Sequence, residues 1–162
     1  MRKIMVVAAA ATVLLAACGD DANPAKDAAD VAEINAMHDM PPVEALTPES
    51  IAYSDVEKFG LTGAGCSFAP DGGIAVVFIG QEEHGYMLQD GKVVEFAPDK
   101  GSAALPVTGY EKYDGKEYAV ALKVTGEPGE GITASQYPGS MTVTDSKGRV
   151  VYDKTGTLGC GS

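Results

Sequence analysis

The stretch EKYDGKEYAVALKVT, residues Glu111–Thr125, decides the fold, because it has the pattern of a β-hairpin. The pair Asp114-Gly115 is typical of a type I′ turn, in which two consecutive residues adopt positive φ. In the return strand the large apolar residues Tyr118, Val120, Leu122 and Val124 alternate with Ala119, Ala121 and Lys123. A period of two predicts a β-strand with one buried face.

Two further hairpins flank this one. Tyr86–Gln89 and Lys92–Ala97 surround Asp90-Gly91, and Met141–Thr144 and Arg149–Asp153 surround a longer turn that ends at Gly148. The apolar run Gly73–Gly80 is predicted to be a central buried strand, and a terminal strand is expected through Leu158. Seven or eight strands in about 100 residues indicate an all-β fold, a small antiparallel barrel or sandwich.

A short helix is expected just before the strands. Thr47-Pro48-Glu49 has the pattern of a helix start, with a capping hydroxyl, a proline in the first turn and an acidic residue after it. Ile51, Val56 and Phe59 are its large apolar residues, and Gly60 is a natural stop.

The beginning of the chain has the pattern of an export leader. Met1-Arg2-Lys3 is positively charged, and Ile4–Leu15 is an apolar run of twelve residues. As a helix this run would rise about 18 Å, too little for a hydrocarbon core of about 30 Å, so it fits a secretory leader better than a membrane span.

Leu15-Ala16-Ala17-Cys18 resembles the lipobox of bacterial lipoproteins. The resemblance covers residues 1–18 and implies that residues 1–17 are a signal peptide and that Cys18 is lipidated. The protein would then be anchored in a bacterial cell envelope, facing the periplasm. Gly19 stands where aspartate favours the inner membrane in that family, which makes the outer membrane the first expectation. An ordinary signal peptide cut after Ala17 is the alternative.

The three cysteines fit the same interpretation. If lipid occupies Cys18, Cys66 and Cys160 remain as a pair in an oxidising compartment, and a disulfide between them is expected. Cys66 precedes the first strong strand pattern and Cys160 follows the last, so the bridge would join the two ends of the β body.

The domain organisation follows from composition. Residues 18–47 hold seven acidic residues against Lys26 alone, with three prolines and many alanines, and are expected to form a disordered tether. Residues 48–162 are expected to form the β domain. Loss of Arg2 and Lys3 with the leader takes the net charge from −11 to −13, which argues against nucleic acid as a partner and permits a cationic one.

Few residues suggest a catalytic or metal-binding site. Met37-His38-Asp39-Met40 could ligate copper and Glu82-Glu83-His84 could hold a divalent ion, but solvated polar segments explain both better. His38 and His84 are the only histidines, and no serine or spare cysteine has an evident base. We therefore expect no enzyme activity, no cofactor and no metal.

Function is then expected in the connections between strands. The acidic segment Gly126–Gly139 contains Glu127, Glu130 and Tyr137, which are the candidate partner-binding residues. An acidic lipobox protein with a small disulfide-tied barrel is similar in plan to the membrane-bound inhibitors of lysozyme. This similarity implies an envelope binding module that captures a basic protein. A barrel that encloses a small apolar ligand, an envelope-assembly component that uses its sheet edge, and a small hydrolase are the alternatives.

Overall fold

The computed structural model describes residues 24–38, 41–128 and 134–161. It consists of two compact units, Met1–Pro41 and Pro42–Ser162, which are considered separately. The leader and Cys18 lie outside the described residues. Within the described part of the chain, no helix has the length and apolar character needed to cross a membrane.

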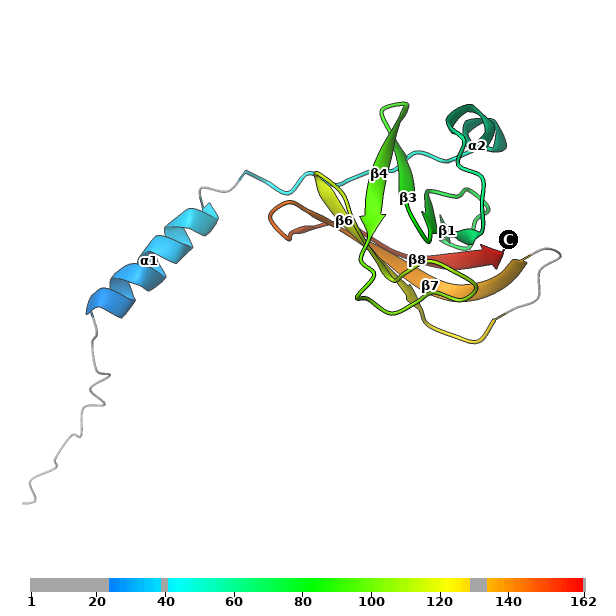
Figure 1. Cartoon of the computed structure of the whole chain (residues 1–162). Coiled ribbons are helices and arrows are strands. Elements are labelled where there is room, and N and C mark those ends of the chain that lie inside the picture. Colours follow the sequence, from blue (N-terminus) through cyan, green and yellow to red (C-terminus); the bar gives the residue numbers. More distant parts are fainter. Residues whose placement is uncertain (1–23, 39–40, 129–133, 162) are drawn as a thin grey trace, which may run out of the picture. The chain divides into compact units, whose positions relative to one another are not determined.

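The second unit is a closed barrel in which each strand is antiparallel to the next and the last strand returns to the first (Figure 1). This confirms the predicted small all-β antiparallel fold and decides between the two expected forms, because the sheet closes as a barrel and not as a sandwich. Its eight strands are β1 (Gly65–Pro70), β2 (Phe78–Gln81), β3 (Gly85–Gln89), β4 (Lys92–Pro98), β5 (Lys112–Asp114), β6 (Tyr118–Val124), β7 (Ala134–Asp145) and β8 (Val150–Gly161).

Side chains from all eight strands fill the interior. On β6 the alternation predicted from the sequence is confirmed, because Val120 and Leu122 are buried while Ala121 and Lys123 are exposed. The largest fully buried side chains share this interior position: Tyr113, Phe68, Phe78, Phe96, Met87, Leu122, Met141 and Leu158. Phe78 packs edge-to-face against both Phe96 and Tyr113, with ring centroids 5.6 and 5.4 Å apart.

The predicted type I′ turn is confirmed at one hairpin and is wrong at another. Between β3 and β4, Asp90 and Gly91 have φ of 51° and 66°, as a type I′ turn requires. The same turn predicted at Asp114-Gly115 is wrong, because Asp114 is still in β5 and pairs with Ala119. Gly115 is needed there for packing: a Cβ atom at this position would lie 2.8 Å from the Phe96 ring.

The apolar run Gly73–Gly80 is not a central strand. Only Phe78 to Gln81 form β2, while residues 71–77 connect it to β1 and leave Ile74 98% exposed. Positive φ at Asp71 and Gly72 turns the chain out of β1 just before the run begins. Val77 still docks on the barrel, with its N–H donating to the Phe68 carbonyl (2.9 Å).

The expected helix start is also wrong. The helix α2 spans Tyr53–Phe59, not Thr47 onward, and it ends as predicted at Gly60, where φ is 68°. The preceding residues are extended instead, because main-chain N–H groups of Glu49 and Ile51 donate to the carbonyls of Leu88 and Val76. Ile51 thereby joins Leu61 and Leu88 in a small second cluster outside the barrel.

Two other segments differ from the sequence-based expectation. Within the segment expected to be disordered, Pro24–His38 forms the helix α1, and its residues 25–35 are all exposed. The return strand of the third hairpin and the expected terminal strand are one strand, β8, which pairs with β7 from Ala134 to Thr144. Leu46, placed by sequence in the tether, is buried against the barrel core.

Candidate functional site: the acidic end of the barrel

The up-and-down topology sorts the connections between strands into two groups. At the end where β1 begins and β8 finishes, which we call the acidic end, the described connections are residues 82–84, 99–111 and 125–128. Residues 71–77, 90–91, 115–117 and 146–149 connect strands at the opposite end, the turn end. Figure 1 shows the C-terminus of β8 and the orange β7–β8 turn at opposite ends of the barrel.

The connections at the two ends differ in charge. The described connections of the acidic end contain five acidic residues and one basic residue, a balance of −4: Glu82, Glu83, Asp99, Glu111 and Glu127 against Lys100. Lys100 forms an ion pair with Glu83 (3.3 Å). The turn-end connections balance three acidic with three basic residues: Asp71, Asp90 and Glu117 against Lys116, Lys147 and Arg149. Much of the acidity in the connections is therefore concentrated at one end.

A buried disulfide closes the acidic end. Cys66 and Cys160 are register partners on β1 and β8, the two strands whose pairing closes the barrel. The bridge between them is present, with the Cα atoms 4.1 Å apart, and this confirms the predicted pairing. Both cysteines are 1% exposed or less, and they belong to the main core. The bridge therefore fixes the first and last strands at the end that carries the long connections.

The connection 99–111 folds over the same end and presents a strained tip. Val107 has φ of 72°, and the Thr108 N–H donates to the Pro106 carbonyl across it (2.9 Å), which defines a γ-turn with positive φ. This conformation is costly for a β-branched residue, yet the Val107 side chain is 62% exposed. The sequence offered no signal for it, because a β-branched residue is among the least expected at positive φ.

Tyr113 secures this connection from inside the barrel. Its hydroxyl donates to the Gln81 carbonyl (2.9 Å) and accepts from the Tyr110 N–H (3.0 Å). Burial raises the pKa of the Tyr113 phenol above its ordinary value of about 10, although the hydrogen bond from Tyr110 opposes this shift. The hydroxyl therefore stays protonated and can keep both bonds at neutral pH.

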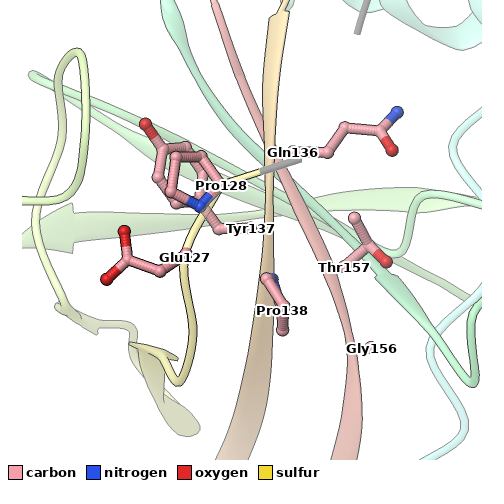
Figure 2. A pocket seen from close by; sticks show the side chains of 7 residues that line it. All are labelled: Glu127, Pro128, Gln136, Tyr137, Pro138, Gly156 and Thr157. Atoms are coloured by element: carbon pink, nitrogen blue, oxygen red, sulfur yellow. The ribbon is translucent and has the colours of Figure 1, made fainter. Parts of the chain in front are cut away.

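Glu127 and Tyr137 line an open groove of about 370 Å³ beside the acidic end (Figure 2). Tyr137 lies in β7 opposite Leu158 and packs partly against the main core, so its predicted place in a loop is wrong. Figure 2 shows the Glu127 carboxylate and the Tyr137 ring on one side of the β7 ribbon, with Gln136 and Thr157 on the other. Glu130 lies outside the described residues.

Of the histidines, only His84 has described side-chain contacts. His84 contacts the Glu95 carboxylate through Nδ1 and stacks on Tyr86, with the ring centroids 5.9 Å apart. His38 ends α1, while Asp39 and Met40 lie outside the described residues. In the part of the chain that the structure describes, no group of three or more His, Cys, Asp or Glu side chains is arranged to hold a metal ion.

Comparison of the chain with family models, with curated proteins and with solved structures finds no match to any of them. Function is therefore inferred from the geometry of the barrel and its acidic end.

Proposed function

We propose that this protein is a lipid-anchored binding module of the bacterial envelope, without enzyme activity, that captures a basic protein with the acidic end of its barrel. The observation that carries the proposal is the charge difference between the two ends, −4 at one and zero at the other over the described connections. A one-sided distribution orients a cationic partner as it approaches, whereas uniform acidity provides only solubility.

The form of the acidic end supports a protein partner. It includes the longest connection, residues 99–111, which displays an exposed valine at residue 107, and a groove lined by Tyr137 lies beside it. Apolar and aromatic contacts within a charged surround are typical of protein interfaces. The alternative of an enclosed apolar ligand has less support, because aromatic and aliphatic side chains from every strand already occupy the barrel interior.

The test measures binding of the mature chain, in detergent, to a basic protein at low and high salt. Lysozyme is the first probe, since it is basic and acts on the cell envelope. Glu82→Gln with Glu127→Gln should weaken binding several-fold and reduce its salt dependence, because exposed charges are screened over about 10 Å at 0.1 M salt. Asp71→Asn with Glu117→Gln removes the same charge from the turn end and should leave the affinity unchanged.

Two outcomes count against the capture proposal. Equal losses in the two double variants would mean that only net charge matters. An absence of binding to lysozyme and to other basic envelope proteins at micromolar concentration would contradict it altogether. Tyr137→Ala, with folding checked by circular dichroism, should also weaken binding, because this side chain lines the groove beside Glu127.

The anchor is tested separately. We expect labelled palmitate to enter the wild-type chain and not Cys18→Ser, whose precursor should stay uncut. Lipidation supports stable attachment because two or more acyl chains hold a protein at a membrane far longer than one. Equal labelling of the two chains would remove the lipid anchor from the proposal and leave the capture function to be judged on binding alone.

A further inference from the structure

The strand β4 has an open edge. All of its residues from Lys92 to Phe96 pair with β3 on one side. On the other side it pairs with β5 only at Ala97 and Pro98, after which β5 ends and the chain turns toward β6. Over the rest of β4, no described strand pairs with this side.

The register shows which groups face the open side. The two-residue turn at Asp90-Gly91 makes Gln89 and Lys92 a hydrogen-bonded pair, and such pairs alternate with non-bonded ones along antiparallel strands. Val93 and Glu95 therefore belong to non-bonded pairs, and their N–H and C=O groups point away from β3. The Leu88 carbonyl, opposite Val93, behaves in the same way on the other strand: it accepts from Glu49 rather than from β4 (2.9 Å).

The main-chain N–H and C=O groups of Val93 and Glu95 have no hydrogen-bond partner in the described part of the chain. Glu95 is exposed and Val93 is half-buried, so the edge is accessible. An unpaired row of N–H and C=O groups is the feature that another strand recognises in strand addition.

An acidic groove lies at each end of this edge. One, of about 430 Å³, is lined by residues of β4 and of the β5–β6 turn and has Glu83, Glu95, Asp114 and Lys116 as its charged groups. The other, of about 280 Å³, is lined by Glu44, Glu49 and Asp90 beside Leu46 and Tyr118. The second groove adjoins the start of β4 through Asp90 and has no lining residue from β4 itself. Six carboxylates line the two grooves, against Lys116 in the first groove and the exposed Lys92 at the start of β4.

We propose that the open edge of β4 takes up an extended, basic segment of a partner protein by strand addition. This surface shares Glu83 and His84 with the acidic end but is centred on the main chain of β4, so the inference goes beyond the proposed function. The main chain of the segment would bond to Val93 and Glu95, and its lysine or arginine side chains would enter the two acidic grooves. A second copy of this chain is a poorer occupant, because pairing two β4 edges would bring four acidic grooves together.

The experiment uses the mature wild-type chain and a synthetic peptide of four Lys-Val repeats with blocked ends. Binding should be saturable, and nuclear magnetic resonance should show the largest amide shifts at Val93 and Glu95. The same peptide with every main-chain amide methylated keeps its charge and loses its donors, so it should not bind. Equal binding of the two peptides would overturn the inference, because it would show attraction by charge alone.

A pair of variants tests the edge from the protein side. Val93→Pro removes an N–H that bonds nothing in the described structure and leaves the bonds between β3 and β4 in place. It should weaken peptide binding roughly tenfold, the order of effect of one shielded hydrogen bond, whereas Val93→Ala keeps the N–H and should retain most of the affinity. Should Val93→Pro fail to fold, the methylated peptide still decides the question.

Two further results separate this inference from the capture proposal. The Glu82→Gln and Glu127→Gln double variant should bind the peptide as the wild type does, because neither residue lines the edge grooves. Amide shifts at the acidic end instead of β4, no peptide binding, or formation of a dimer through β4 in sedimentation would each overturn strand addition.

Discussion

The two ends of the barrel differ in the length of their connections and in the contacts that hold them. The acidic end has the longest connection, residues 99–111, and is held by contacts between distant parts of the chain: the Cys66–Cys160 bridge and the two hydrogen bonds of the Tyr113 hydroxyl. The β7–β8 turn, at the turn end, is held locally. In this turn Asp145 accepts from the main-chain N–H groups of Lys147 and Arg149, both at 2.9 Å.

The difference shows how a small barrel can support long surface connections at one end. Long connections can present a strained residue such as Val107 only if the strands beneath them are fixed by strong, non-local contacts. Short turns need no such support, because their own hydrogen bonds determine their shape. Damage to non-local contacts should therefore affect the acidic end most, and damage to a turn should remain local.

Loss of the disulfide should have the largest effect. Cys66→Ala with Cys160→Ala should lower the free energy of unfolding by about 2–5 kcal/mol, because the bridge closes a loop with a sequence separation of 94 residues. Denaturant titration measures the change, and hydrogen exchange should show faster opening at the acidic end than at the β7–β8 turn. Free thiols at both positions in protein purified without reductant, or an unchanged stability, would contradict the prediction.

Removal of the Tyr113 hydroxyl should have an intermediate effect. Tyr113→Phe leaves the Gln81 carbonyl and the Tyr110 N–H without their partner, which should cost about 1–3 kcal/mol in the free energy of unfolding. Tyr152→Phe is a control on β8, since the Tyr152 hydroxyl makes no hydrogen bond among the described residues. Equal destabilisation by the two substitutions would mean that the hydroxyl of Tyr113 does not secure the acidic end.

The smallest effect is expected at the turn end and should depend on pH. The hydrogen bond from the Arg149 main-chain N–H is the largest cause that lowers the pKa of Asp145, and the Arg149 side chain and the Lys147 N–H lower it further. A folded-state pKa below the unfolded value of about 3.9 stabilises the protein above that pH, and this contribution is lost as pH falls through the folded value.

Asp145→Asn should therefore reduce stability at pH 7, and the difference from the wild type should shrink as the pH is lowered below 4. Thermal unfolding between pH 7 and pH 3 measures both. Glu117→Gln, at the same end, removes an equal charge whose carboxylate has no hydrogen bond in the described structure. A difference for Asp145→Asn that stays constant over this pH range would show that its charge does not stabilise the turn.

Local patterns in the chain were sufficient to predict much of the barrel. Alternation on β6 and the Asp90-Gly91 turn depend on neighbouring residues alone, and both are confirmed. The two cysteines could be paired because the third falls in a segment that resembles a lipobox, and the structure contains their bridge. Partner contacts of Glu127 and Tyr137 remain predictions, since the structure contains no partner.

The errors occur where packing overrides the local signal. The apolar run Gly73–Gly80 had the composition of a buried strand, but strand pairing uses only its last residues and leaves Ile74 in solvent. Asp114-Gly115 had turn chemistry, yet the glycine is there to accommodate Phe96. Thr47-Pro48 had a capping pattern, but hydrogen bonds to β3 and to the β1–β2 connection hold this segment extended.

The amino-acid sequence by itself determined the fold class, the disulfide pair and the acidic character of the protein, because periodicity, cysteine number and charge are properties of the chain. Only the tertiary structure decided that the acidic connections gather at one end and that β4 has an unpaired edge. Both depend on which strands are neighbours and in what register, and these follow from the closing of the barrel as a whole.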